Sequence, residues 1–227
     1  MKKYRFFLLA LLLLLCMTCT AGCQSAHEDA PSPETALHEL QEAVKQRDVQ
    51  KISSYVDLEQ FLENTYDISA REMSTRIDVL AKRYPEDPFF WHTTEFMQQY
   101  AAEHRDISLH FIHDILAYYF ANEAPAVSYD SNPTSWLSGE LAKLHAASTA
   151  EWKEFRKLDK QHTIAVLRLK GDGSPYGNLT DGITLELGME QQADGRWKFT
   201  GIENIPELIL PVADKAEMFW TLQGWQD

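Results

Sequence analysis

The sequence predicts an α+β protein in which helices come first, an antiparallel sheet follows, and one more helix ends the chain. Two changes in the spacing of apolar residues carry this prediction. From Pro33 to about Ala147 the apolar residues recur every three or four positions, as on one face of a helix. From His162 they alternate with polar residues, as in half-buried strands, and the helical spacing returns after Pro211.

The first 22 residues are predicted to be a signal peptide. Lys2, Lys3 and Arg5 give a basic start, and Phe6–Leu15 is an unbroken apolar run. A membrane-spanning helix needs about 20 apolar residues, so this run is too short to be one. Its length is typical of the hydrophobic segment of a secretory signal, which indicates export.

The segment Thr20-Ala21-Gly22-Cys23 ends the signal. It resembles the lipobox of bacterial lipoproteins, in which small residues precede a cysteine that is diacylated on sulfur. Thr20 stands where that family usually has Leu. The resemblance implies that Cys23 carries palmitate-type chains and holds the mature protein on the extracytoplasmic side of a membrane of the cell envelope. Simple secretion after cleavage nearby, and an uncleaved membrane anchor, are the alternatives.

Cysteine content and charge limit the classes of partner. All three cysteines lie within the first 23 residues, so an acylated Cys23 leaves no disulfide for the mature chain. The net charge of −13 becomes −16 when the three positive charges of the signal are removed. So acidic a chain is expected to bind no nucleic acid and to lack a polybasic membrane surface. Membrane lipid is expected to be held through the acylated Cys23 alone.

The mature chain divides into a tether and a folded part. Residues 23–33 are polar, include two prolines and show no apolar periodicity, which favours a flexible tether. Residues 34–227 are predicted to form a single α+β domain. A helical insertion is expected within it, over about residues 87–147.

Helix-capping residues place the first helices. Ser32-Pro33 begins one, because Ser suits the capping position and Pro the first turn. Arg47-Asp48 is predicted to break it, and Asp57 to cap a later helix. Ser69-Ala-Arg-Glu72 has the capping-box pattern and is expected to open a further helix that ends at Pro85.

Both ends of the folded part resemble one family. The early matching residues are Ala36, Leu40, Ala43, Arg47, Asp48, Val56 and Asp57, and the late ones are Gly195-Arg-Trp-Lys-Phe199 and Ile202-Glu-Asn-Ile-Pro206. These segments resemble exported bacterial domains with a nuclear transport factor 2-like fold, and also a family of uncharacterised bacterial envelope proteins. The resemblance implies a curved, cone-like antiparallel sheet on which the N-terminal helices pack. The helical insertion, expected to pack on the same sheet, is longer than that fold requires and is where this chain departs from the family.

The insertion is rich in aromatic residues, which predicts two core helices. One carries Phe89, Phe90, Phe96, Met97 and Tyr100; the next, capped by Asp106, carries Phe111, Ile112, Ile115, Leu116 and Tyr119. The alternative is that the second stripe lines a groove for a partner. A loop over 122–135 and a short helix over 136–147 are expected to follow.

The sheet is predicted from alternating patterns. Residues 148–158 fit either a helix or a strand, and we favour a helix or bend that passes into a strand. Strands are expected over 162–170, 183–192 and 196–203, with a loop over 171–180 and a turn at Gly195. In the last strand Trp197, Phe199 and Gly201 share a face, opposite Lys198, Thr200 and Ile202. A helix over 211–223 is expected to cover the sheet; a surface aromatic patch there is the alternative.

Few residues suggest chemistry. His110, His113 and Asp114 share a helical face and are the candidate metal ligands. Phe111 and Ile112 define the buried face of that helix, so solvated histidines are the favoured interpretation. The chain has no phosphate loop, calcium loop or Gly-x-Ser-x-Gly motif. We therefore expect no cofactor and assign no catalytic residue.

Three functions follow from these observations. The first is a non-enzymatic lipoprotein that binds an envelope protein. The second is a carrier or sensor of a small apolar ligand, whose pocket Trp197 and Phe199 would line together with residues 89–119. The third is a metal-dependent enzyme that uses His110 and His113.

Overall fold

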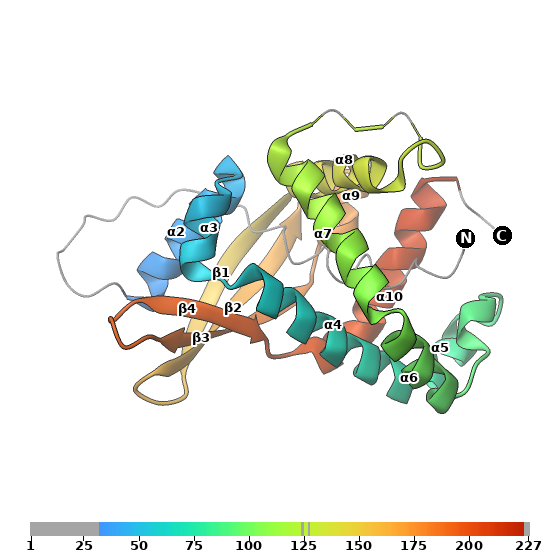
Figure 1. Ribbon diagram of the computed structural model, residues 1–227, viewed down its shortest axis with the longest axis horizontal. Helices are drawn as coiled ribbons and strands as arrows, with labels where there is room; N and C mark the ends of the chain where they lie inside the picture. The colour runs from blue at the N-terminus through green and yellow to red at the C-terminus, as the bar shows by residue number, and fades with distance from the viewer. Residues whose placement is uncertain (1–31, 124, 127, 225–227) are drawn as a thin grey trace.

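The computed structural model describes residues 32–123, 125–126 and 128–224 (Figure 1). The predicted signal peptide, Cys23, most of the tether and Trp225 lie outside the described residues. Within them are nine α-helices, one 3₁₀ helix and a four-stranded antiparallel sheet, so the predicted α+β class is confirmed. Searched over the same residues, no helix has the length and apolar character needed to cross a bilayer.

The first three helices begin where the capping residues predict. Ser32 caps α2 (Pro33–Gln46) and accepts a hydrogen bond from the Thr35 N–H at 3.2 Å. Arg47 ends α2 in the left-handed region, with a φ of 57°. Asp48 then caps α3 (Val49–Tyr55), and Asp57 caps α4 (Leu58–Thr75).

The capping-box prediction at Ser69 is wrong. Ser69 is buried inside α4, which continues to Thr75, and the break comes at Arg76 before α5 (Ile77–Arg83). Leu62, Tyr66, Ala70 and Met73 form one continuous buried stripe across this point. That stripe keeps the helix intact, whereas a capping serine would need extended backbone there.

The aromatic insertion forms a chain of helices. These are η2 (Pro88–Phe90), α6 (Thr94–Glu103), α7 (Arg105–Ala121) and α8 (Pro133–Ala146). The predicted cap at Asp106 is displaced, since Asp106 lies in the first turn of α7 and His104 occupies the capping position. The expected loop before α8 ends at Asn132, which caps that helix through the Ser135 N–H.

The sheet is a meander of consecutive strands in the order β1-β2-β3-β4. Its strands are β1 (Ser148–Lys157), β2 (His162–Gly171), β3 (Thr184–Gln191) and β4 (Trp197–Ile202). The segment 148–158, which fitted either a helix or a strand, is a strand from its first residue. Ser148 pairs with Gly171, and Lys157 pairs with Thr163. The favoured helix or bend at its start was therefore wrong.

A bulge alters the predicted faces of β4. Phe199 lies opposite Met189, but Ile202 lies opposite Leu187, so one extra residue of β4 is accommodated between them. An extra residue reverses the alternation beyond it. Ile202 is consequently buried like Trp197 and Phe199, and the prediction that it faces the other way was wrong.

The segment between β2 and β3 contains a short helix where a loop was predicted. Ser174 caps α9 (Pro175–Thr180) by accepting from the Gly177 N–H at 3.0 Å. The fit against the end of β2 is close. A Cβ atom at Gly177 would lie 2.7 Å from the Asp172 backbone nitrogen and 3.0 Å from the Ala147 oxygen.

The last helix, α10 (Ile205–Leu222), starts before the predicted position and contains Pro211 in its interior. Pro206, in the first turn, is the proline that marks its beginning. The structure therefore moves the predicted start from Pro211 back to Ile205.

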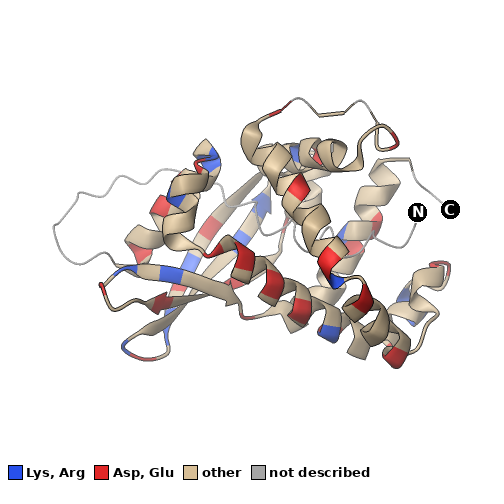
Figure 2. Ribbon diagram, viewed as in Figure 1, with Lys and Arg blue, Asp and Glu red and all other residues tan. Residues whose placement is uncertain are grey.

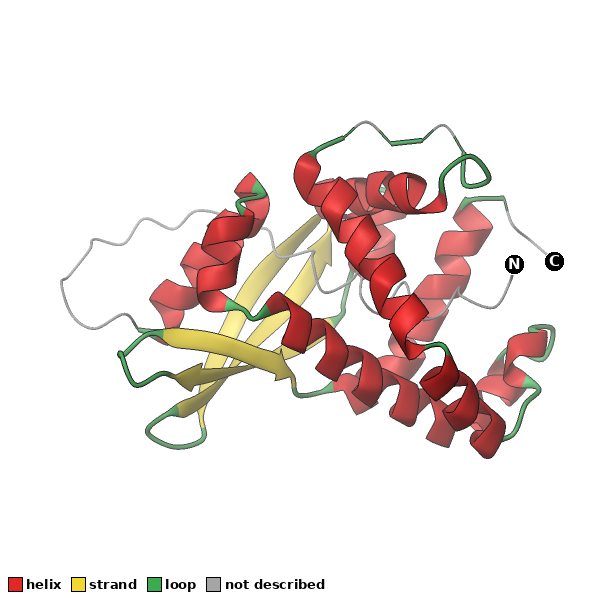
Figure 3. Ribbon diagram, viewed as in Figure 1, coloured by secondary structure: helices red, strands yellow, loops and turns green. Residues whose placement is uncertain are grey.

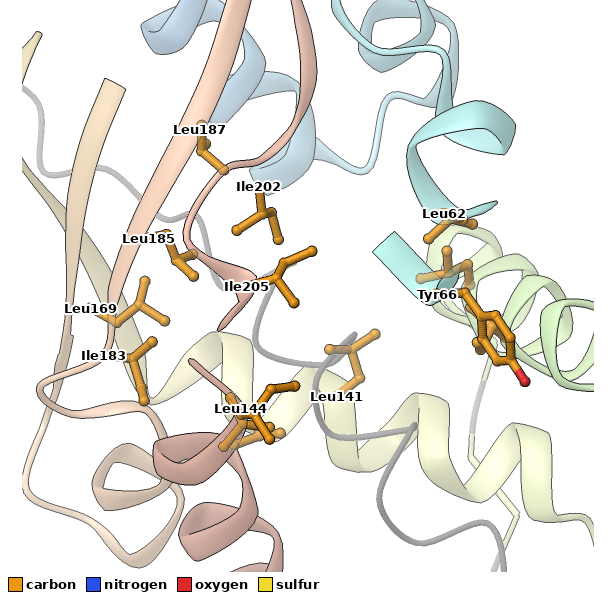
Figure 4. Close-up of a cluster of buried hydrophobic side chains, with 14 of the residues drawn as sticks. Leu62, Tyr66, Leu141, Leu144, Leu169, Ile183, Leu185, Leu187, Ile202 and Ile205 are labelled. Atoms are coloured by element: carbon orange, nitrogen blue, oxygen red, sulfur yellow. The ribbon is translucent and has the colours of Figure 1, made fainter. Parts of the chain in front are cut away.

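Sheet and helices share one core. The inner sheet face carries Leu169, Leu185 and Leu187, and Figure 4 shows these side chains together with Leu141 and Leu144 of α8. The same buried cluster continues to Leu62 and Tyr66 of α4 and to Phe219 of α10. In Figure 3 the strands occupy one half of the molecule and several helices extend away from them.

Two sets of contacts give the direction of α2. At its C-terminal end the Arg47 guanidinium donates to the Tyr119 backbone carbonyl oxygen at 3.0 Å. The Tyr119 hydroxyl in turn contacts His145 near the end of α8. The adjacent Ala147 oxygen accepts from the Asp172 N–H at the end of β2. The start of α2 therefore points toward the β1–β2 and β3–β4 hairpins. In Figure 1, α5 and α6 lie at the other end of the longest axis.

Candidate binding surface

Four aromatic rings at four-residue intervals are stacked along α6. The ring centroids of His92 and Phe96 are 4.0 Å apart, those of Phe96 and Tyr100 are 6.1 Å apart, and those of Tyr100 and His104 are 4.0 Å apart. The interplanar angles are 24°, 19° and 21°, so the rings are close to parallel. Residues four apart are neighbours on a helix, which places this row on one side of α6.

Trp91 directly precedes His92, the first ring of the row, and is exposed. Its side chain is 65% exposed, and that of Phe96 is 44% exposed. The Trp91 indole N–H donates to the Pro85 oxygen at 2.8 Å, which fixes the ring in this exposed position. We call Trp91 together with His92, Phe96, Tyr100 and His104 the α6 aromatic surface.

The α6 aromatic surface corrects one prediction. Phe89, Phe90 and Met97 are buried as expected, but Phe96 is not. Phe89 makes an edge-to-face contact with Tyr100, with centroids 6.1 Å apart, and so connects the surface to the core. The four-residue spacing of His92, Phe96, Tyr100 and His104 was visible in the sequence and is the signal that could have revealed the row.

Acidic residues surround this surface. Residues 85–106 contain five Asp and Glu, against one Lys or Arg. That one is Arg105, and its guanidinium is held by Asp67 at 2.7 Å and Glu63 at 3.3 Å. Hydrogen bonds from its own backbone N–H and from Thr93 hold the pKa of Glu95 below its usual range. Glu95 therefore remains charged at neutral pH.

A groove of about 280 Å³ lies on the other side of α6. Its walls combine small side chains with a few polar ones: Tyr66, Asp67, Ala70, Arg71 and Ser74 of α4, Gln98, Ala101 and Ala102 of α6, and Arg105 of α7. The volume is slightly below the range typical of sites for drug-sized ligands. The groove can take a small apolar group.

A buried polar junction joins α2, α7 and α8. Tyr119 Oη and His145 Nδ1 are 2.5 Å apart, and the Arg47 guanidinium lies 4.4 Å from the Tyr119 ring centroid. His145 is 8% exposed, and its Nε2 atom has no hydrogen-bond partner among the described residues. Burial, and then the charge of Arg47, lowers the pKa of His145 to about 4. The imidazole is therefore neutral at pH 7.

A second buried cluster centres on the Glu140 carboxylate. It accepts hydrogen bonds from Lys143 at 2.7 Å, from Gln223 at 3.0 Å and from the Tyr176 hydroxyl. Burial, and then the bond to Glu140, raises the pKa of Tyr176, so that hydroxyl stays protonated. Both carboxylate oxygens have donors, and the cluster joins α8, α9 and α10. Sequence patterns gave no sign of this cluster or of the one at His145.

The candidate metal ligands do not converge. His110 Nε2 lies 3.7 Å from Asp114 Oδ2, and the His110 side chain is largely exposed. His113 is half-buried and forms no set with these two. Across the described part of the chain, no three His, Cys, Asp or Glu side chains are grouped as a metal site requires.

The candidate pocket residues lie in the core. Trp197 and Phe199 are both buried on β4, where Phe199 also forms an isolated bridge with Val56. Neither residue lines the groove beside α6.

Comparison with protein-family models, with curated proteins and with solved structures finds no match to this chain.

Proposed function

We propose that the protein is a lipid-anchored, non-enzymatic binding protein of the cell envelope, and that its partner binds the α6 aromatic surface. The observation that carries this proposal is the exposure of two large aromatic side chains five residues apart, Trp91 just before the stacked row and Phe96 within it. Large aromatic side chains dominate the energetics of protein interfaces. Exposed apolar patches on a folded protein mark such interfaces.

The position of this surface suits an anchored protein. Ser32 is nine positions after Cys23, so a tether of any conformation spans at most about 30 Å. An acylated Cys23 would keep the start of α2 near the membrane. The helix α6, along which most of this surface lies, is at the other end of the longest axis from the start of α2 (Figure 1).

Two substitutions test the anchor. In the native host, Cys23→Ser is expected to abolish incorporation of an alkyne-labelled palmitate and to release the protein from the membrane fraction. Cys19→Ser is the matched control and is expected to retain both. Incorporation that persists in Cys23→Ser would overturn the assignment of the acylated residue.

A photo-crosslinking residue in place of Phe96 tests the binding surface in intact cells. One defined adduct is expected, and a second substitution, Trp91→Ala, is expected to remove it. The same probe in place of Trp152, which is 53% exposed on β1, is the control. Equal adducts from both positions, or an adduct indifferent to Trp91→Ala, would count against the proposal.

The groove between α4 and α6 supports a second candidate, a carrier or sensor of a small apolar ligand. Ala102→Trp would fill that groove while leaving the α6 aromatic surface intact. A bound small molecule seen by native mass spectrometry in the parent protein and absent from Ala102→Trp would favour this candidate.

The kinship with nuclear transport factor 2-like domains stays a proposal that rests on the quoted sequence patterns.

A further inference from the structure

Four of the five acids of residues 85–106 form no ion pair with a described cation, and the fifth, Asp106, lies 3.9 Å from Arg105. Glu86 and Glu95 are exposed and form no ion pair with any described residue. Glu103 accepts a hydrogen bond from the neutral Gln99 amide at 2.7 Å. Arg105, the one cation of residues 85–106, pairs with carboxylates of α4. The exposed Lys82 and Arg83 of α5 precede this segment, and Arg83 pairs with Asp214. Figure 2 shows repeated acidic positions along this part of the molecule.

We infer that the partner presents a segment rich in Lys and Arg to the α6 aromatic surface. This inference rests on the proposed function and names the chemistry of its partner. Cationic side chains are attracted to aromatic faces, and their long apolar stems cover the exposed rings. The neighbouring carboxylates supply the charge complementarity that speeds association and selects the partner.

Other occupants fit this surface less well. An anionic membrane or a nucleic acid would be repelled by the carboxylates. A second copy of the chain carries the same net charge of −13. Its exposed Lys157 and Lys160 in the β1–β2 hairpin are a basic feature that it could offer. Self-association is therefore an outcome that the test must distinguish.

Fluorescence anisotropy tests the inference with the full-length protein in nonionic detergent micelles. The probe is a labelled peptide of alternating Lys and Leu; the same peptide with Glu, or with Ser, in place of Lys is the comparison. The Lys peptide is expected to bind at least about tenfold more tightly than either of the others. Its affinity is expected to fall as salt is added.

Variants then locate the binding site. The double variant Trp91→Ala, Phe96→Ala is expected to raise the Kd for the Lys peptide by at least about tenfold, because two anchoring rings are lost. Glu95→Gln with Glu103→Gln is expected to raise the Kd by about threefold and to reduce its salt dependence. Trp152→Ala and Glu154→Gln are the matched controls on the sheet and are expected to leave the Kd unchanged.

Each contrary outcome has a distinct meaning. Equal binding of the three peptides, or a Kd unaffected by Trp91→Ala, Phe96→Ala, would overturn the inference. If the parent protein alone self-associates and Lys157→Glu with Lys160→Glu abolishes this, the partner is a second copy and the inference also fails. If none of the three peptides binds while the Trp91-dependent crosslinked adduct still forms in cells, the proposed function stands and the partner has a different chemistry.

Discussion

The sheet and the helices that precede it carry their surface charges in different ways. Residues 148–203 contain nine Asp and Glu against eight Lys and Arg, whereas residues 33–147 contain 19 against nine. On the sheet the charges pair with one another: Glu151 contacts both Lys153 and Lys170, and Arg156 contacts both Glu154 and Glu186. The charges of the sheet nearly cancel, while the helical part carries ten more acids than bases.

Aromatic residues show this contrast only in part, because Trp152 on β1 is 53% exposed. Trp197 and Phe199 are buried beneath the helices, whereas Trp91 and Phe96 are exposed at the far end. A region whose charged side chains pair with one another and whose aromatic rings are buried is suited to a structural role. A region that leaves aromatic rings exposed and carboxylates unpaired is suited to binding. The four predictions below test how far the two regions are separate.

The largest effect is expected where the two regions share one core. Leu144 of α8 is 0% exposed and lies beneath the sheet, so Leu144→Ala is expected to lower the free energy of unfolding by about 2–5 kcal/mol. Urea unfolding followed by circular dichroism measures this loss. Leu158→Ala, at an exposed hairpin residue, is the control and is expected to change stability by less than about 0.5 kcal/mol. A second unfolding transition in Leu144→Ala would show that the regions unfold independently.

The next effect concerns acid stability at the junction of α2, α7 and α8. The pKa of His145 is about 4 in the folded protein, against 6.5 for an ordinary histidine. Between these values the unfolded chain binds the extra proton, so stability is complete above pH 6.5 and falls as the pH drops toward 4. The loss is about 3 kcal/mol over this window.

Urea unfolding across that pH range measures this dependence. His145→Gln is expected to be less stable at neutral pH but to lose much less on acidification. His110→Gln, at an exposed histidine, is expected to follow the parent protein. Identical pH profiles for His145→Gln and the parent would show that the junction does not sense acid.

A smaller effect is expected where α9 packs against the end of β2. Gly177→Ala would place a Cβ atom 2.7 Å from the Asp172 backbone nitrogen, which must then move. We expect a loss of about 1–3 kcal/mol, measured by thermal unfolding. Gly201→Ala has open space at its Cβ position and is the control. If Gly177→Ala is as stable as the parent protein, α9 can move away from the end of β2 at little cost in free energy.

The smallest effect tests the charge pairing of the sheet surface. Hydrogen bonds from Lys153 and Lys170 lower the pKa of Glu151 to about 2. A titration followed by NMR is expected to show this midpoint, and Lys153→Ala is expected to raise it toward the usual range. Lys160→Ala is the control and is expected to leave it unchanged. A normal midpoint in the parent would weaken the contrast between the two regions.

Local chemistry made much of the fold predictable. Ser32, Asp48 and Asp57 cap helices as expected because capping depends on neighbouring backbone groups. Gly195 adopts the positive φ, 85°, that its hairpin turn requires. The two-residue alternation located β2 and β3 because one face of each strand is buried.

The remainder depended on contacts between distant residues. The reversal of Ile202 follows from its pairing with β3, and Ser69 is helical because α4 packs as one continuous stripe. Tyr119 and His145 are 26 residues apart, and Glu140 and Gln223 are 83 apart, so no local pattern joins them. The exposure of Phe96 likewise depends on which side of α6 faces the core.

The edge of the sheet affects how copies of this chain behave when crowded. β1 is an edge strand of ten residues, and an edge strand of this length can pair with a strand of another molecule. A bulge between Trp152 and Glu154 interrupts its regular pairing face, and Lys153, Glu154 and Arg156 line its exposed half. A neighbouring strand would have to accommodate this bulge, and charged side chains on an edge strand disfavour such pairing. Extension of the sheet by a second copy at this edge is therefore disfavoured.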